Sequence, residues 1–345
     1  MRLYPHSSLS KSTNTAPVPS CPSHGSALRI MPGNDTSVEV FHKWSQSFGD
    51  VMCLNVMGNR IVILSSLEAA TDLLEKRGSN YADRPSFPIY ERLGWKYSLV
   101  FMPYGPYFRK LRKMLQHPFE KDKVARFRSI QEQETSVMLH SFLTKPEQMF
   151  DHAHRYTIGL IMEITYDHRI LSEDDSYLKM ASSLLKILGD IARPSLLDLS
   201  PIFDKIPGWF PGAWHIEFIK EARPRILRYI QDPVAEVQEH ISAGTAKPSF
   251  VSQQLEDFSR EGPLTSKNLY DVSMVAHQIF SVFGGGSETS YHTITMFVAC
   301  MLLNPDVQRK GQEEIDKVVG EGRLPDFTDR DSLPYVDCIV KEVMR

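Results

Sequence analysis

The sequence has no long apolar run and no excess of basic residues. No stretch reaches the roughly 20 consecutive apolar residues of a membrane-spanning helix, so we expect a chain without an anchor, which we interpret as soluble. Its 39 Lys and Arg residues against 42 Asp and Glu residues give a net charge of −3 at pH 7. That balance argues against a nucleic-acid-binding surface, which needs clustered positive charge.

Cysteine is also scarce. The four cysteines are too few for a disulfide framework and too widely spaced for a zinc or redox pair, so we expect free thiols in a reducing compartment. His152 and His154 form an H-x-H pair, but side chains two apart on a helix point in different directions, so we predict no metal site there. The cysteines are Cys21, Cys53, Cys300 and Cys338.

The first 36 residues are rich in serine, proline and threonine and lack an apolar core. They match neither a signal peptide nor a membrane anchor, and we predict that residues 1–36 are disordered or irregular. Residues 37–345 then form the folded part. The whole chain is 42% hydrophobic, which is enough for a large core.

Apolar periodicity predicts a mainly α fold with a small β-sheet near the N-terminus. A short helix is expected over residues 37–47. Two apolar runs flank Gly58 and Asn59, which predicts a β-hairpin over residues 51–64. Residues 65–68 match a capping box that would open a helix closed by Gly78. A loop rich in proline and aromatic residues is expected to follow, as far as Pro103.

Beyond Pro106 most of the chain has helical periodicity. Breaks rich in proline, glycine and polar residues predict irregular segments over residues 193–214 and over residues 244–262, the second with one short helix. The expected helices lie over residues 106–167, 176–192, 216–242, 265–303 and 304–320, and from residue 335 onward.

A run of three glycines interrupts the longest apolar-periodic stretch, in Gly284-Gly285-Gly286-Ser287-Glu288-Thr289-Ser290. Each glycine costs roughly 0.8–1 kcal/mol against alanine inside a helix. One interpretation is a loop between two ordinary helices. The other is one helix over residues 266–303, about 57 Å long, opened locally so that a ligand can approach the backbone. Glu288 could then take or relay a proton, and Thr289 could hydrogen-bond a bound oxygen species or water. Because no histidine base adjoins Thr289, nucleophilic attack is disfavoured.

The segment from Tyr104 to Lys113 carries four basic residues in its last five positions. A solvated helix face is the ordinary interpretation, and an anion site or a surface for an acidic protein partner are the alternatives. Phe108 and Arg112 are four residues apart and share one face, where they could stack on a flat anionic ligand and pair with its carboxylate.

Together, these segments resemble a cytochrome P450, most closely the fungal microsomal-type haem-thiolate monooxygenases. The central helix of that family carries (A/G)-G-x-(D/E)-(T/S), which Gly285 to Thr289 match. A later helix carries E-x-x-R, matched by Glu342 and Arg345, which alone would indicate only a surface ion pair. Order and spacing agree from about residue 37 to residue 345.

A third motif of the family, W-x-x-x-R, lies on the helix after the first sheet. Phe108 and Arg112 match it, with phenylalanine in place of tryptophan. Residues 81–85 and 101–105 also resemble the fungal group. The resemblance implies haem as cofactor, a small apolar substrate oxidised with molecular oxygen, and electrons from NADPH through a separate reductase.

The resemblance also implies a role for each matched residue. Glu288 and Thr289 would relay protons on the oxygen-binding side of the haem, which Gly285 and Gly286 would line. Arg112 would pair with a haem propionate. Phe108 would lie beside it in the cofactor site, Glu342 and Arg345 would form a structural ion pair, and residues 88–101 would contact substrate.

The sequence departs from the family pattern in two respects. The haem-ligating cysteine of the family lies in an F-x-x-G-x-x-x-C-x-G loop well past E-x-x-R, and none of the four cysteines has this context. The N-terminal anchor that places the microsomal group at the endoplasmic reticulum membrane is also missing. We therefore expect a partial cytochrome P450 domain, as in a fragment, a mispredicted gene product or a degenerate copy.

We expect this 345-residue partial domain to be inactive, and a stable ferrous–carbon monoxide complex with a thiolate-type absorption band would contradict that expectation. Two other functions stay open. The chain could be a non-enzymatic helical protein that keeps an apolar cavity for a lipid-like ligand, or that has no function, and haem titration would distinguish it from an enzyme. The second alternative is an unrelated helical scaffold. Convergence of the three motifs on one cavity would exclude it.

Overall fold

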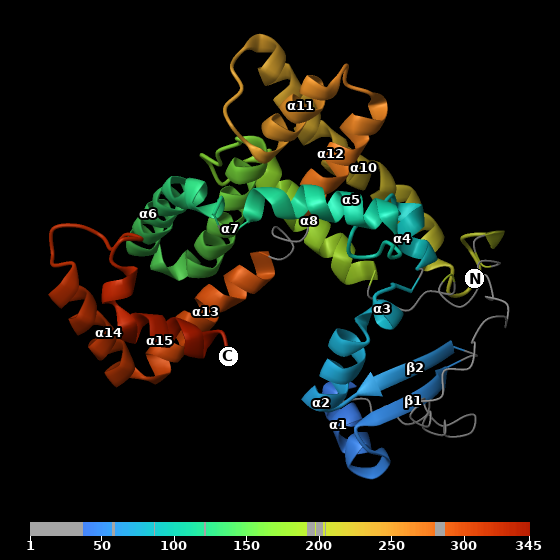
Figure 1. Cartoon of the computed structure of the whole chain (residues 1–345), viewed down its shortest axis with the longest axis horizontal. Helices are drawn as coiled ribbons and strands as arrows, with labels where there is room; N and C mark the ends of the chain where they lie inside the picture. Colours follow the sequence, from blue (N-terminus) through green and yellow to red (C-terminus); the bar gives the residue numbers. More distant parts are fainter. Residues whose placement is uncertain are drawn as a thin grey trace. The chain divides into compact units, whose positions relative to one another are not determined.

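The computed structural model describes residues 37–56, 59–85, 87–120, 122–191, 197, 203, 205–279 and 287–345 (Figure 1). These residues divide into two compact units. The N-terminal unit takes its residues from Met1–Phe87 and Ser195–Ile206, and the main unit from Pro88–Pro194 and Pro207–Arg345. The described part is mainly helical with one small sheet near the N-terminus, which confirms the predicted fold class. The predicted irregular segment 1–36 lies outside the described residues.

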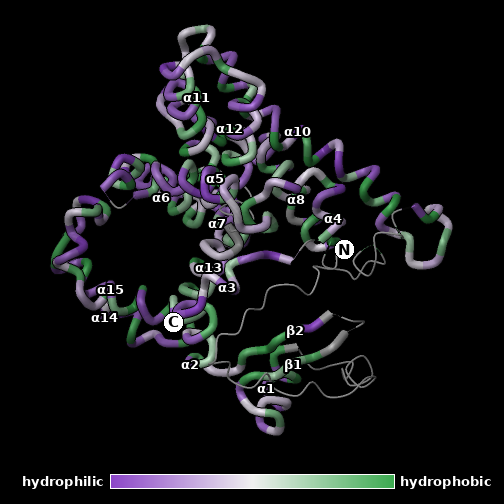
Figure 2. The backbone as a smooth tube through the Cα atoms, turned by 45° about the vertical axis from the view of Figure 1, so that its right-hand side comes forward, coloured by the Kyte–Doolittle hydropathy of each residue, from purple (hydrophilic) through white to green (hydrophobic). Residues whose placement is uncertain are grey.

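The sheet of the N-terminal unit forms where the hairpin was predicted. β1 (Val51–Val56) pairs antiparallel with β2 (Asn59–Leu64), with Val51 opposite Leu64. Both strands are largely hydrophobic along their length (Figure 2). The predicted short helix is α1 (Ser37–Phe48), which packs against β1.

The core of this unit contains Val40 of α1 and Met52 and Cys53 of β1, each at most 4% exposed. Cys53 is disulfide-bonded, so the expectation of a free thiol is wrong for this residue. Spacing along a sequence does not reveal which sulfurs the fold brings together. Cys300 and Cys338 are free.

The segment after β2 differs in detail from its prediction. Ser66 caps it, because its hydroxyl accepts the Ala69 backbone N–H at 3.3 Å. Gly78 does not close a helix but begins one, since its φ is not in the left-handed region that ends helices and the break falls at Arg77 instead. The pieces are α2 (Leu67–Ala70), the π-helical η2 (Thr71–Lys76) and α3 (Gly78–Tyr81).

The main unit is built from helices. Single 3₁₀ turns lie at His117–Phe119, Val124–Phe127, Pro146–Gln148 and Arg330–Ser332. The α-helices are α4 (Pro88–Leu93), α5 (Pro106–Gln116), α6 (Arg128–Thr144), α7 (Met149–Tyr166), α8 (Ser176–Ile191), α10 (Trp214–Ala243), α11 (Phe250–Glu261), α12 (Ser266–Gln278), α13 (Ser287–Leu303), α14 (Pro305–Val318) and α15 (Pro334–Val343). None of the described helices is long and apolar enough to cross a membrane.

Two predicted loops contain more helix than the sequence patterns indicated. Residues 88–93 form α4, because Pro88 suits a first helical position and Ile89 and Leu93, four residues apart, are both buried. The segment 244–262 holds the twelve-residue α11, which Ser249 and Ser252 open with a reciprocal capping box.

Helix α7 lies at the centre of the main unit and packs against α6, α11 and α13. Its buried residues include Ala153, Ile158 and Met162, all fully inaccessible. Helix α10 packs against α4, α11 and α12 and contains two internal prolines, Pro224 and Pro233. Proline inside a helix costs roughly 3 kcal/mol. Burial of the apolar stripe Ile226, Ile230, Val234 and Val237 offsets that cost.

The predicted long helix over residues 266–303 corresponds to α12 and α13, whose described parts are separated by residues 280–286. The two helices have different neighbours. Helix α12 packs against α5, α10 and α11, whereas α13 packs against α7, α14 and α15. The continuity of one helix across the glycines lies outside the described residues and stays a prediction.

Helices α14 and α15 pack closely. A Cβ at Gly311 of α14 would lie 3.1 Å from Ile339 Cδ1 of α15, so the small residue permits the approach. Helix α15 has no side-chain cap of its own, and Glu314 of α14 supplies one. Its carboxylate accepts the backbone N–H groups of Tyr335 at 3.1 Å and Val336 at 2.9 Å.

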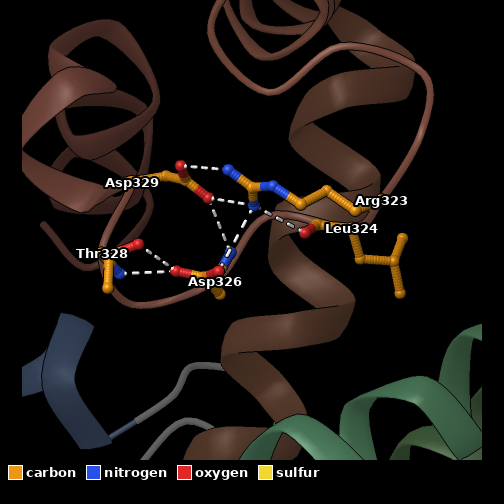
Figure 3. A network of polar contacts seen from close by, with 5 residues as sticks. All are labelled: Arg323, Leu324, Asp326, Thr328 and Asp329. Atoms are coloured by element: carbon orange, nitrogen blue, oxygen red, sulfur yellow. Dashed lines mark hydrogen bonds and ion pairs between the residues drawn. The ribbon is translucent and has the colours of Figure 1, made fainter.

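The loop between α14 and α15 is fixed by a polar network around Arg323 (Figure 3). The guanidinium donates to both carboxylate oxygens of Asp329 at 2.6 Å. Asp329 also accepts the Asp326 backbone N–H at 2.9 Å, and Asp326 accepts the Thr328 hydroxyl at 2.5 Å. The hydrogen bonds from Arg323 lower the pKa of Asp329 to about 2.

Candidate cofactor and proton-relay site

Helix α5 carries one candidate part of a functional site. Pro106 begins the helix, as predicted, and Leu111 is fully buried. Tyr107, Lys110 and Leu111 are spaced at three and four residues and form the face toward α12. The opposite face carries Phe108 and Arg112.

The face toward α12 is held by a buried carboxylate. Asp271 of α12 has no exposed surface, and it accepts the Tyr107 hydroxyl on one oxygen and the Lys110 ammonium on the other. Burial, followed by this hydrogen bond, raises the pKa of Tyr107. The basic segment is therefore not a solvated face throughout, because Lys110 neutralises a buried charge.

The opposite face of α5 presents Phe108 and Arg112 together. The Arg112 guanidinium lies 6.0 Å from the centre of the Phe108 ring, within the range of a cation–π contact. Phe108 is half-buried, Arg112 is exposed, and Arg112 forms no ion pair with any carboxylate in the described part of the chain. A flat cation lying on an aromatic ring suits an anionic carboxylate such as a haem propionate.

The proton-relay candidates lie at the start of α13. Glu288 and Thr289 occupy the first turn of this helix, and the backbone carbonyl of Thr289 accepts the Thr293 hydroxyl at 2.7 Å. Thr289 is exposed. Gly285 and Gly286 lie outside the described residues, as does the side chain of Glu288. The roles of these four residues therefore stay predictions.

The E-x-x-R residues lie at the end of α15. Arg345 Nη2 lies 3.1 Å from Glu342 Oε1, and the two side chains are 80% and 67% exposed. An ion pair with this exposure contributes little to stability. Its proposed structural role stays a prediction.

Sequence reasoning missed a buried polar contact between α12 and the segment after α4. The Trp95 indole N–H donates to His277 Nε2 at 2.9 Å, so this imidazole carries its proton on Nδ1. The Ser98 hydroxyl donates to Gln278 Oε1 at 2.9 Å. All four side chains are buried. Burial lowers the pKa of His277 to about 3, so the ring stays neutral.

Aromatic stacking fixes the same segment. The rings of Tyr90 and Phe101 stack with centroids 3.7 Å apart, and Trp95 lies beside both rings. The available signal in the sequence was the aromatic richness of residues 84–103, together with two polar residues at positions 277 and 278 that directly follow the apolar residues 274–276. Nothing in either segment by itself identifies the other as its partner.

The described residues contain no cluster of three or more His, Cys, Asp or Glu side chains placed to hold a metal ion. The cofactor-binding role of Phe108 and Arg112 on α5 stays a prediction, as does the role of the Thr289 hydroxyl in the first turn of α13.

The chain matches the model of a known protein family. The family model for cytochrome P450 matches residues 16–345. Among curated proteins, the chain is 32% identical over 310 residues to cytochrome P450 monooxygenase 136 of Postia placenta, covering 89% of this chain and 58% of the relative. It is 34% identical over 327 residues to a cytochrome P450 monooxygenase of Armillaria gallica, covering 92% and 63%.

A third relative is cytochrome P450 monooxygenase COX2 of Coprinopsis cinerea, 33% identical over 327 residues, covering 92% of this chain and 61% of the relative. All three relatives are fungal, which agrees with the fungal group that the motifs resemble. The chain spans about three fifths of the length of these relatives.

Proposed function

This chain belongs to the cytochrome P450 family, and we propose that the whole protein is a haem-dependent monooxygenase that inserts one oxygen atom into a small apolar substrate. The observation that carries the proposal is the match along residues 16–345, together with relatives whose names are those of monooxygenases. Haem, when bound, supplies the activation of molecular oxygen. The residues of this chain bind and orient it and move protons.

The proposed role of Arg112 follows from the exposed face of α5. Its guanidinium pairs with a propionate carboxylate, and the Phe108 ring holds the guanidinium in a flat orientation. Phenylalanine lacks the indole N–H of the tryptophan found in the family motif. The ring in this chain therefore contributes packing and cation–π attraction but no hydrogen bond.

The proposed proton relay uses Glu288 and Thr289 at the start of α13. A hydroxyl donates and accepts hydrogen bonds, and a carboxylate beside it can receive protons from solvent and pass them on. The exposure of Thr289 supports contact with water. Gly285 and Gly286 would leave room beside the haem face for oxygen.

The proposed partners are a reductase that delivers electrons from NADPH and a substrate contacted by residues 88–101. Arg109 and Lys113 are exposed on α5, which supports docking of an acidic surface of the reductase beside the cofactor edge. The endoplasmic reticulum membrane is the proposed location of the whole protein, as in the microsomal group that the motifs resemble.

Haem binding is the primary test. Protein made from the complete natural transcript is titrated with ferric protoporphyrin IX, reduced, and exposed to carbon monoxide. Saturable binding and a thiolate-type shift of the absorption band support the proposal. Arg112→Ala is expected to lower haem affinity about tenfold, because a charge-assisted hydrogen bond is lost. Lys113→Ala, an exposed neighbour of equal charge, serves as control. A protein that binds no haem would contradict the proposal.

The relay is tested separately. Thr289→Val keeps the shape of the side chain and removes the hydroxyl, so it is expected to lower the product formed per NADPH consumed while leaving haem affinity unchanged. Thr293→Val, one turn further along α13, is the matched control. Equal coupling in the Thr289 variant and the unmodified enzyme would argue against a role for this hydroxyl.

A further inference from the structure

Helix α5 has two functional faces that point away from each other. Each helical residue advances the side-chain direction by about 100°, so Arg112 lies roughly 140–160° around α5 from Tyr107 and Lys110. Tyr107 and Lys110 contact α12, whereas Phe108 and Arg112 are presented on the other side. A contact that fixes one face therefore fixes the direction of the other.

Asp271 is the group that fixes the inner face. Its carboxylate is fully buried, and its two oxygens accept hydrogen bonds from the Tyr107 hydroxyl and the Lys110 ammonium. A buried carboxylate that loses a charged partner is strongly destabilised. The two contacts, three residues apart on α5, oppose rotation of this helix about its axis in either direction. No other described carboxylate forms an ion pair with α5.

The sensitivity of Arg112 to such a rotation follows from its length. The guanidinium lies roughly 8 Å from the axis of α5, so a rotation of about 20° would displace it by about 3 Å. That displacement exceeds the tolerance of a hydrogen bond to a propionate oxygen. The proposed Arg112 contact therefore requires a tighter hold on the rotation of α5 than the apolar packing of Leu111 alone would provide.

We propose that Asp271 is a positioning residue for the cofactor: through Tyr107 and Lys110 it holds α5 in the rotation that presents Arg112 to the haem propionate. This inference rests on the proposed function. It adds a residue that lies outside the family motifs in this sequence and that acts without touching the haem.

A double-mutant cycle tests the inference on the same full-transcript protein, with ferric protoporphyrin IX as the probe and its dissociation constant as the readout. Asp271→Asn keeps the shape but removes the charge, and is expected to weaken haem binding about five- to tenfold. In an Arg112→Ala background the same change is expected to weaken it less than about twofold, because its effect passes through Arg112. Asp271→Glu should restore part of the affinity.

Two further variants keep the inference testable if Asp271→Asn folds poorly. Tyr107→Phe removes one of the two contacts and should weaken haem binding about two- to threefold, again only when Arg112 is present. Asp257→Asn changes an exposed aspartate of α11 and should have no effect. Circular dichroism of each variant checks that the fold is retained.

The outcomes separate the two proposals. Coupling between positions 271 and 112 supports the positioning role. Additive losses in a protein that binds haem would show that Asp271 is only structural, and would overturn this inference while leaving the proposed function intact. Absence of haem binding by the unmodified protein would overturn both.

Discussion

Neutral His277 should make the stability of the main unit depend on pH in a way that can be calculated. The ring is fully buried in α12 and accepts the Trp95 indole N–H. Burial lowers its pKa from 6.5 to about 3. In the folded chain the ring therefore stays neutral down to about pH 3, whereas in the unfolded chain it takes up a proton below pH 6.5.

The sign follows from proton binding. Between pH 6.5 and about pH 3 the unfolded state binds more protons at this residue, so the free energy of unfolding falls as the pH falls through that window. Each pH unit below 6.5 costs about 1.4 kcal/mol, which gives about 2 kcal/mol at pH 5. Above pH 6.5 the residue contributes no pH dependence.

Urea unfolding at pH 7.5 and pH 5.0 measures this term when the native chain is compared with His277→Gln. Glutamine does not titrate, and its carbonyl can still accept the Trp95 N–H. The native chain should lose about 2 kcal/mol more than the variant between the two pH values. All other titrating groups are common to both proteins, so their effect cancels. Equal losses in the two proteins would refute the assignment of a buried, neutral imidazole.

Four further substitutions test individual contacts, by thermal or urea unfolding or by amide hydrogen exchange. Gly159→Ala should destabilise the chain by about 1–3 kcal/mol, because the new Cβ would lie 2.8 Å from the buried Glu134 carboxylate, whereas Gly189→Ala has open space and should stabilise by up to about 1 kcal/mol. Similar effects at both positions would contradict this packing. Glu314→Gln should cost about 1 kcal/mol and raise amide hydrogen exchange at the start of α15, where the carboxylate caps two N–H groups; unchanged exchange there would argue against the cap. Arg323→Ala should raise exchange in residues 324–333 without affecting α7, and uniform exchange would show that the network does not order this loop.

Most elements of the described fold were predictable from local patterns. Apolar runs around a Gly-Asn pair produced β1 and β2, and prolines at first positions marked the starts of α5, α14 and α15. The prediction failed where burial decided the conformation. Residues 88–93 form a helix because Ile89 and Leu93 are both buried in the core. The proline- and aromatic-rich composition of that segment had indicated a loop instead.

The candidate site was predictable in part. Helical spacing by itself placed Phe108 and Arg112 on one face of α5, and the structure has them in contact. It did not reveal that Lys110, in the same basic run, neutralises a carboxylate 161 residues away. A run of basic residues has the same pattern whether its members face water or a buried acid.

The sequence by itself determined family membership, the helical class and the composition of the α5 and α13 motifs, because these depend on residue order and on a periodicity of a few residues. Only the tertiary structure decided which polar groups are buried and what satisfies them. Asp271 meets Lys110, Trp95 meets His277, and Glu314 caps α15. Each contact joins elements that are adjacent in space but distant along the chain. A buried polar group must be paired, and only the packing of the helices determines which partner comes within hydrogen-bonding distance.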